Sequence, residues 1–348
     1  MRICLYSPYL DTLGGGERYL ATIAESFSKH EVVFFWDNPK IVRKLESRFN
    51  LDLSRVSVLP DIFKRRESFL KKATLLKNFD VAIYLSDGSI PTPLSKKNIL
   101  HFQVPFILKD GRKLSNRLKF QRYEAVICNS RFTKKYIDET YGVASYVIYP
   151  PVDFSFFRSG RKENLIISVG RFSQVFGGKK QEVLIEVFKN FYREYSDWRL
   201  ILAGGSQDEE YVARLIEQTR GLPIKILANV SSSDLKELYS KAKIYWHAAG
   251  FDEDLRRCPE RAEHFGISVV EAMSASCAPI VFSGGGLTEI VDNSHNGLLW
   301  QEKDELLSKT IRLARDQKLL EKLAAHAKTK ARQFSKERFI EEFKKVLR

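Results

Sequence analysis

The feature that most constrains the fold is an alternation of short apolar runs with amphipathic helical patterns, which occurs twice along the chain. In the first series these segments follow one another at residues 3–6, 17–29, 32–36, 81–85, 125–129 and 131–141. Strands that alternate with helices are typical of βαβ units, which build parallel sheets with helices on their faces. The first half of the chain is therefore predicted to be an α/β domain.

Two prolines interrupt this alternation near the middle of the chain. Pro150 and Pro151 can continue neither a helix nor a central strand, and the polar residues 159–164 follow them. We interpret this stretch as a linker. The predicted domains are an N-terminal domain of residues 1–153 and a C-terminal domain of residues 154–333.

The alternation restarts after the linker. Its members are residues 165–169, 181–195, 198–203, 209–218, 224–227, 232–241, 244–247, 268–274 and 278–282. This pattern implies two stacked α/β domains with a cleft between them, in which ligands bind beyond the carboxyl ends of the strands. A last helical pattern follows the completed second domain, and we predict that residues 334–348 pack back on the first domain.

Length and composition exclude several classes of protein. The 348 residues, 44% hydrophobic and 29% charged, are ordinary for two soluble globular domains, so a disordered chain, a collagen and a disulfide scaffold are excluded. The sequence has no apolar stretch long enough to span a bilayer and no signal-peptide pattern, so we expect a cytoplasmic protein. The four cysteines lie far apart without a C-x-x-C pair, and we expect buried structural thiols.

The net charge of +14 indicates an anionic partner, which is a nucleic acid, an anionic lipid or a phosphorylated small molecule. Residues 64–72 and 109–122 combine basic side chains with large apolar ones, a pattern that suits helices lying on an anionic membrane surface. A solvated basic face and an RNA-binding face are the alternatives. No RNA-binding signature occurs in the sequence, so we expect no nucleic-acid partner.

Gly14, Gly15 and Gly16 follow the first predicted strand, where glycines allow a ligand to approach the backbone closely. Their spacing matches neither a dinucleotide-binding fingerprint nor a P-loop. The loop is therefore interpreted either as a ligand-binding turn or as a tight turn alone.

A second loop, at residues 170–181, presents Arg171 and Lys179 after a predicted strand. Arginine can bind two phosphate oxygens at once, and lysine adds a point charge, so a diphosphate is a natural partner. A solvated basic loop is the alternative.

Glu263 and Glu271 lie on either side of Phe265 and Gly266, which are expected to end a loop just before a helix. The first amide groups of that helix, near Ile267, would attract an anion. Because two carboxylates repel a diphosphate, we assign them to sugar and ribose hydroxyls. Two surface glutamates beside an ordinary helix are the alternative.

The segment from Glu263 to Glu271 resembles the E-x7-E motif of retaining GT-B glycosyltransferases, and its surroundings resemble family GT4, which contains bacterial and archaeal mannosyltransferases. Further similar stretches lie in the family's order along nearly the whole chain, at residues 14–18, 129–133, 149–153, 170–179, 245–247 and 284–291. The resemblance implies two Rossmann-like, doubly wound domains that face a central cleft, with acceptor bound by the first and nucleotide-sugar by the second.

The resemblance also implies the activity and the site. A hexose of mannose or glucose type would move from a nucleotide-diphospho-sugar to a glycan or lipid-linked acceptor with retention, without a metal or a further cofactor, at the inner face of a membrane. Arg171 and Lys179 would hold the diphosphate, Glu263 the donor sugar and Glu271 the ribose. The other implied donor-binding residues are Gly15, Gly16, Phe265, Gly266, Ile267, Ser268, Gly285 and Gly286.

Two positions depart from the family pattern. Where the family has an H-x-P-like segment, Gln103 stands two residues before Pro105 and His101 four before it, so either residue is a candidate contact to acceptor or donor sugar. Ser276 replaces the usual glycine after the E-x7-E helix, where a left-handed backbone would cost serine about 1 kcal/mol.

Three alternatives to this function are open from the sequence. They are another GT-B enzyme such as a nucleotide-sugar hydrolase or synthase, a binding module without catalysis, and an RNA-binding protein. The binding module is disfavoured because both cations and both glutamates of the motif are present.

Overall fold

The computed structural model describes residues 1–64, 67–174 and 178–347. Contacts within the chain divide it into two compact units, which we call unit 1 (Met1–Pro151 and Glu337–Arg348) and unit 2 (Val152–Lys336). Among the described residues, no helix combines the length and the apolar character that a bilayer crossing requires.

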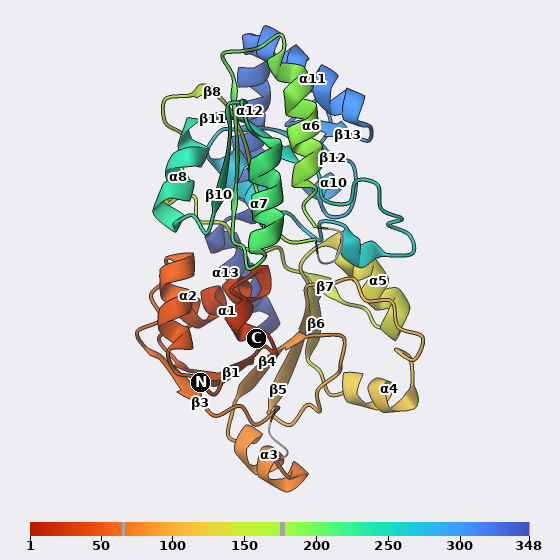
Figure 1. The fold of residues 1–348 in the computed structure, drawn as a ribbon. Helices are drawn as coiled ribbons and strands as arrows, with labels where there is room; N and C mark the ends of the chain where they lie inside the picture. Colours follow the sequence, from red (N-terminus) through yellow and green to blue (C-terminus); the bar gives the residue numbers. More distant parts are fainter. Residues whose placement is uncertain (65–66, 175–177, 348) are drawn as a thin grey trace. The chain divides into compact units, whose positions relative to one another are not determined.

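Unit 1 is built on a seven-stranded parallel sheet with the order β3-β2-β1-β4-β5-β6-β7 (Figure 1). Its strands are β1 (Arg2–Tyr6), β2 (Glu31–Phe35), β3 (Val56–Leu59), β4 (Val81–Ser86), β5 (Lys97–Phe102), β6 (Ala125–Cys128) and β7 (Tyr146–Val147). Its helices are α1 (Gly15–Ser26), α2 (Ile41–Phe49), α3 (Phe69–Leu76), α4 (Leu114–Phe120), α5 (Arg131–Tyr141) and α13 (Lys336–Leu347).

Both faces of this sheet are buried, which explains why its strands are continuous apolar runs. Along β1, Ile3 and Leu5 pack into one core, whereas Cys4 packs into the other. Helices α1, α2 and α13 contribute to the first core, and α3 and α5 contribute to the second. The sheet is therefore doubly wound.

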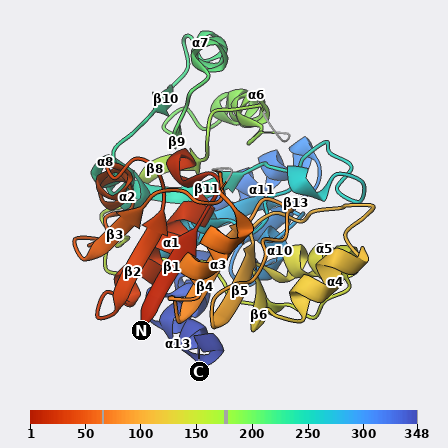
Figure 2. The same ribbon diagram turned by 90° about the horizontal axis from the view of Figure 1, so that it is seen from below.

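The C-terminal helix α13 belongs to unit 1, although more than 180 residues of unit 2 precede it. Phe339 and Phe343 are buried, and the Phe339 ring meets the Tyr19 ring of α1 edge to face with 4.8 Å between centroids. Figure 2 shows α13 next to the strands of unit 1. Its apolar stripe closes the first core.

Unit 2 repeats the strand order of unit 1 in a six-stranded parallel sheet, β10-β9-β8-β11-β12-β13. Its strands are β8 (Glu163–Val169), β9 (Arg199–Gly204), β10 (Ile224–Ala228), β11 (Ala242–His247), β12 (Ala278–Phe282) and β13 (Leu298–Trp300). Its helices are α6 (Gln181–Tyr192), α7 (Glu209–Gln218), α8 (Ser232–Lys241), α9 (Ile267–Ser274), α10 (Leu287–Ile290), α11 (Lys303–Arg315) and α12 (Gln317–Ala331).

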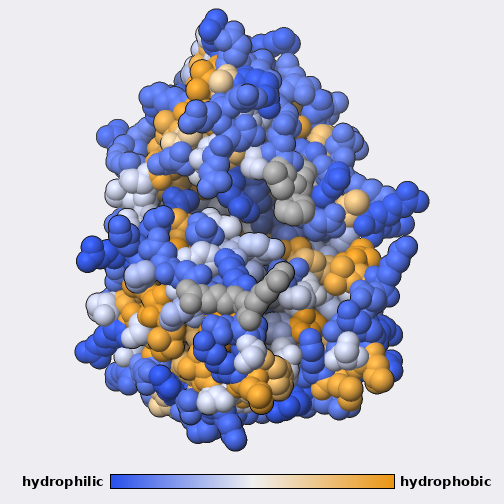
Figure 3. Space-filling view, turned by 60° about the horizontal axis from the view of Figure 1, so that its bottom comes forward, coloured by the Kyte–Doolittle hydropathy of each residue, from blue (hydrophilic) through white to orange (hydrophobic). Residues whose placement is uncertain are grey.

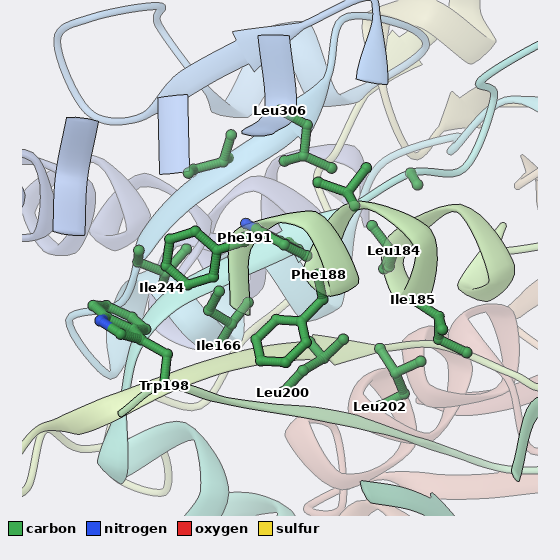
Figure 4. Packing of buried hydrophobic residues seen from close by; sticks show 14 of the residues in the cluster. Ile166, Leu184, Ile185, Phe188, Phe191, Trp198, Leu200, Leu202, Ile244 and Leu306 are labelled. Carbon is green, nitrogen blue, oxygen red and sulfur yellow. The ribbon is translucent and has the colours of Figure 1, made fainter. Parts of the chain in front are cut away.

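A core of unit 2 lies between its sheet and helices α6, α7, α11 and α12. Phe188 and Phe191 of α6 pack against Ile166 and Leu200 on neighbouring strands, with Trp198 beside them (Figure 4). Burying an aromatic side chain of this kind stabilises the fold by roughly 1.5–3 kcal/mol. This core holds the strand ends in place, and the predicted fold class of two doubly wound α/β units is confirmed.

Candidate functional site

The strand order of unit 2 reverses between β8 and β11, and open α/β sheets bind ligands beyond such a switch point. The loop after β8 carries Arg171 and Lys179, and β11 ends at His247. Residues 175–177 of the predicted diphosphate loop lie outside the described residues. The following contacts show which side chains meet at this edge of the sheet.

Three side chains from separate segments converge on one carboxylate oxygen. Lys179 Nζ lies 2.7 Å and His247 Nε2 lies 2.8 Å from Glu263 Oε2. The His247 side chain is buried, and those of Lys179 and Glu263 are only partly exposed. These contacts join two residues that the sequence predicted for catalysis, Lys179 and Glu263.

The hydrogen bonds define the protonation of this cluster. The backbone N–H of Ala249 donates to His247 Nδ1, so Nε2 carries the proton and donates to Glu263. Burial lowers the pKa of His247 despite the nearby carboxylate, which keeps the ring neutral. Burial by itself would raise the pKa of Glu263, but the charge of Lys179 and the hydrogen bonds from His247 and Lys179 hold it well below its usual range. Glu263 is therefore ionised.

The glycine-rich loop after β12 supports the backbone that carries Glu263. The N–H of Gly286 donates to the Glu263 carbonyl at 2.8 Å. A Cβ atom at Gly286 would lie 2.3 Å from the His264 carbonyl oxygen, which no side chain tolerates. The N–H of Gly286 is thus engaged within the chain, and Gly285 lies equally close to the Glu263 backbone.

Helix α9 begins directly after this loop. Gly266 precedes it with φ at 111°, in the left-handed region, and a Cβ atom there would lie 2.8 Å from Leu287 Cδ2. Ile267 and Ser268 form the first turn, where helices have unsatisfied amide groups and a positive dipole end. Phe265 is buried beside them. The predicted helix start at Ile267 is present, and its binding of an anion stays a prediction.

Glu271 lies in the second turn of α9 and is buried. The Tyr239 hydroxyl donates to Glu271 Oε2 at 3.1 Å. One turn earlier, Ser268 Oγ lies 2.8 Å from the Tyr245 hydroxyl. Two tyrosines thus position the polar side chains at the start of α9.

Arg171 differs from Lys179 in its surroundings. Its carbonyl accepts a hydrogen bond from Gln181 Nε2 at 3.0 Å, while its side chain is exposed. No ion pair joins its guanidinium to another residue of the described segments. Arg171 is therefore available to an anion from solution.

Sequence reasoning missed a second charged cluster next to this one. Lys180 Nζ lies 2.6 Å from Glu253 Oε1, and Arg261 Nη1 lies 2.8 Å from Glu253 Oε2. Burial opposes the charge on Glu253, but both cations lower its pKa. Lys180 lies 73 residues from Glu253 in sequence, so the sequence does not indicate this ion pair.

The loop after the helix confirms the prediction for Ser276. Helix α9 ends at Ser274, and Ser276 has φ at 61°, in the left-handed region that favours glycine. Its N–H donates to the Met273 carbonyl and closes the helix end. The serine therefore tolerates backbone strain.

In unit 1, Gly15 and Gly16 form the first turn of α1. Glu17 accepts hydrogen bonds from the Ser7 and Thr12 hydroxyls and from the Gly14 N–H, at 2.9 to 3.1 Å. This bonding makes the loop a rigid helix start. Whether its glycines contact a donor stays a prediction.

His101 is fully buried at the end of β5, and its ring stacks on Tyr19 with 3.9 Å between centroids. Burial lowers its pKa to about 3, so the ring is neutral. Its Nε2 lies next to Gln103, which is half-buried and whose Oε1 accepts a hydrogen bond from Asn129 Nδ2 at 3.2 Å. Of the two candidates, Gln103 is the one nearer to solvent.

Known proteins share this sequence pattern and fold. The profile of the family described as Glycosyl transferases group 1 matches residues 152–333, just over half of the chain. An uncharacterized glycosyltransferase of Methanocaldococcus jannaschii is 25% identical over 251 residues, which are 71% of this chain and 66% of that protein. A GDP-Man:Man(3)GlcNAc(2)-PP-Dol alpha-1,2-mannosyltransferase of Dictyostelium discoideum is 26% identical over 250 residues, 64% of this chain and 46% of that protein.

These matches therefore span less than two thirds of the relatives' own length. Among solved structures, Anabaena HepE in complex with UDP and glucose superposes with a TM-score of 0.77 at 19% identity, covering 100% of this chain and 99% of that one. Sucrose-phosphate synthase from Thermosynechococcus elongatus has a TM-score of 0.73 at 16% identity, covering 99% and 98%. These likenesses show the GT-B fold that the sequence predicted.

Proposed function

The chain belongs to the glycosyl transferases of group 1, and on that premise we propose that it moves a hexose, of mannose or glucose type, from a nucleotide-diphospho-sugar to an acceptor with retention at the anomeric carbon. The named mannosyltransferase relative supports a mannose donor. The UDP and glucose bound to HepE support a glucose donor equally. The cluster of Lys179, Glu263 and His247 beside the start of α9 is the observation that carries the proposal.

The first step of the proposed reaction is departure of the nucleotide diphosphate. Negative charge grows on the phosphate oxygens as the bond to the sugar breaks, so fixed cations stabilise the transition state more than the bound substrate. The exposed side chain of Arg171 is free to reach the diphosphate, and the side chain of Lys179 is held in place by Glu263. The first amide groups of α9 add a positive dipole end.

The two glutamates have different proposed roles. Glu271 accepts ribose hydroxyls while Tyr239 holds its carboxylate. Both cluster contacts of Glu263 use Oε2, so Oε1 can accept a hydroxyl of the donor sugar without breaking either one. Because Glu263 already binds a cation and a neutral imidazole, we assign it to positioning rather than to nucleophilic attack. The departing phosphate then accepts the proton of the acceptor hydroxyl.

Metal independence is part of the proposal. Arg171, Lys179 and the start of α9 supply positive charge where a divalent cation would otherwise neutralise the diphosphate. Unit 2 does contain one D-x-D sequence, Asp252-Glu253-Asp254 in the loop after β11, but its central Glu253 is paired with Lys180 and Arg261.

The proposed acceptor is a glycan or a lipid-linked glycan that unit 1 receives at an anionic membrane surface. Leu70 of α3 and Leu114 of α4 are 76% and 71% exposed, and Lys71 and Arg117 lie near them in sequence. Figure 3, which brings the lower end of Figure 1 forward, shows several apolar areas on this surface. Arg65 and Arg66 of the predicted basic segment lie outside the described residues.

Sedimentation with lipid vesicles tests the membrane part. Vesicles with anionic lipid should carry the protein down at low salt and release it as salt rises, and neutral vesicles should bind it poorly. Replacing Leu70, Leu114 and Leu118 by Ser should abolish sedimentation, whereas Ile216→Ser, at an exposed apolar position of unit 2, should leave it intact. A wild-type chain that ignores vesicles but retards RNA at the same salt would support the RNA-binding alternative.

Product analysis tests the transfer itself. A thermal-shift panel of UDP-, GDP- and ADP-sugars comes first, because a ligand at 100 times its Kd adds about 2.7 kcal/mol of stability. The stabilising donor is then incubated with and without glycan acceptors, and NMR gives the anomeric configuration of the product. Free sugar released at one rate regardless of acceptor would identify a hydrolase, and an inverted product would overturn retention.

A further inference from the structure

Unit 1 contains a hollow of about 280 Å³ that the residues discussed so far do not line. It lies beyond the carboxyl ends of three adjacent strands: Asp11 follows β1, Trp36 and Asp37 follow β2, and Asp61 and Lys64 follow β3. A water molecule takes about 30 Å³ of liquid, so the hollow has the volume of roughly nine waters. That volume suits one six-membered sugar ring with its hydroxyls.

Asp61 is the unusual residue of this hollow because it is fully buried yet has a free oxygen. Its Oδ1 accepts the backbone N–H groups of Phe63 at 2.9 Å and Lys64 at 3.1 Å. Its Oδ2 is buried and accepts no hydrogen bond from any residue in the described part of the chain. Buried carboxylate oxygens are normally satisfied, so this one indicates a donor that arrives with a ligand.

The surroundings keep Asp61 in this position. Its own N–H donates to Asp37 Oδ1 at 3.1 Å, which ties the loop after β3 to the loop after β2. The N–H of Trp36 donates to the Leu59 carbonyl at 2.8 Å. The hollow is therefore formed before any ligand binds.

Trp36 supplies an apolar wall. Its indole is half-buried, and Lys64 Nζ lies 3.9 Å from the ring centroid. The C–H face of a sugar ring packs well on an indole, while its hydroxyls bond to carboxylates, amides and ammonium groups. Asn38 and Lys44 also line the hollow and complete this mixed set of donors and acceptors.

We propose that this hollow binds one hydroxyl-rich sugar ring, with a ring hydroxyl donating to Asp61 Oδ2 and the ring face on Trp36. Three carboxylates disfavour a phosphate group, and the charged lining disfavours an apolar ligand. Two lysines oppose a metal ion, and within the described residues no three His, Cys, Asp or Glu side chains form a metal-binding group. Naming this ring as part of the acceptor rests on the proposed transferase function, whereas sugar binding by the hollow does not.

Tryptophan fluorescence gives a site-specific readout of binding. The chain has four tryptophans, and Trp198, Trp246 and Trp300 are buried in unit 2, so Trp36 alone reports on the hollow. The probes are the methyl glycosides of mannose, glucose and N-acetylglucosamine, titrated with saturating UDP or GDP present to occupy a nucleotide site. At least one glycoside should change the emission saturably, and Trp36→Phe should abolish that change.

Asp61→Asn tests the hydrogen bond. Asparagine keeps the oxygen that caps Phe63 and Lys64 but replaces the free acceptor by a donor, so affinity should fall at least about tenfold. Asp52→Asn is the matched control and should leave the affinity unchanged. Exposed Asp52 accepts the N–H of Ser54 two residues later, as Asp61 accepts that of Phe63, but it lies outside the hollow. If Asp61→Asn fails to fold, the folded variant Trp36→Phe is used in its place. Saturation-transfer NMR should then show that Trp36→Phe binds the same glycosides more weakly than the wild type does.

The outcomes separate this inference from the proposed function. Saturable binding that Asp61→Asn weakens supports the hollow even if no sugar transfer is ever detected. No binding by any glycoside, equal affinity in Asp61→Asn and wild type, or competition by UDP or GDP would overturn it. If transfer is active but Asp61→Asn leaves the KM of a glycan acceptor unchanged, the hollow is not an acceptor site.

Discussion

Units 1 and 2 share one strand order, yet they differ in whether the buried carboxylates near their strand ends have hydrogen-bond partners. In unit 2, Glu253, Glu263 and Glu271 each have a partner within the chain. In unit 1, Asp61 keeps one buried oxygen without a partner among the described residues. Topology thus decides where a site forms, and the loop residues decide whether it is complete in the free protein.

The two units also differ in their surfaces. The exposed large hydrophobic side chains of the described part of unit 1 are Met1, Tyr9, Phe69, Leu70, Ile107, Leu108, Leu114, Leu118 and Tyr146. In the described part of unit 2, Ile216 is the one exposed large hydrophobic side chain. Contiguous exposed apolar side chains indicate a surface that meets a partner, and unit 1 carries nearly all the large ones of the described residues. The following predictions test this division of roles.

The largest effect is expected for Lys179, which should matter to chemistry rather than to folding. Lys179→Ala should lower kcat about a hundredfold or more, and weaken donor binding less, because charge grows on the diphosphate only in the transition state. Lys189→Ala removes an equal charge from an exposed position on α6 and should change neither. Steady-state kinetics with wild-type turnover in Lys179→Ala would remove this residue from the site.

The second prediction distinguishes the two glutamates of unit 2. Glu271→Gln retains an acceptor for Tyr239 but removes the charge that we propose binds the ribose hydroxyls, so affinity for free UDP or GDP should fall roughly ten- to a hundredfold. Glu263→Gln should leave that affinity nearly intact while lowering turnover. Calorimetry with both variants decides the matter, and equal losses of nucleotide affinity would contradict the split.

A smaller effect is expected where a helix of each unit ends. Helix α5 of unit 1 ends at Tyr141 and is followed by Gly142 with φ at 68°, whereas the left-handed residue that follows α9 of unit 2 is Ser276. Ser276→Gly should stabilise the protein by up to about 1 kcal/mol, and Gly142→Ser should destabilise it by a similar amount. Thermal unfolding of unit 2 should shift by roughly 2–4 °C per kcal/mol. Shifts of the same sign would contradict the strain argument.

The sequence predicted most of the sheet because its strands are buried on both faces and therefore read as apolar runs. Helix α9 was predictable from Phe265 and Gly266, which end the preceding loop. Helix α2 was not, because no side chain caps its start at Lys40 and only Ile41 and Leu45 are buried along its nine residues. Local signals alone do not identify so short a helix.

The candidate site was predictable as a set of residues but not as a set of contacts. Lys179 and Glu263 were expected to bind different parts of the donor, yet they lie 2.7 Å apart although 84 residues separate them in sequence. The hydrogen bond from His247 to Glu263 could not be predicted, because it depends on where the pairing of β11 with its neighbouring strands places the end of that strand. The hollow of unit 1 combines three loops after three strands, and no local pattern marks such an arrangement.

The smallest effect is expected for removal of metal ions. If unit 2 stabilises the leaving diphosphate through Arg171, Lys179 and the start of α9, excess EDTA should change kcat by less than about twofold. This result should be compared with that for Lys179→Ala. If a metal ion neutralised the leaving diphosphate, Lys179→Ala would have little effect on kcat and EDTA would lower kcat strongly. Loss of activity under EDTA that Mg²⁺ or Mn²⁺ restores would reverse the assignment. It would then direct attention to Asp252 and Asp254, the two aspartates of the loop after β11.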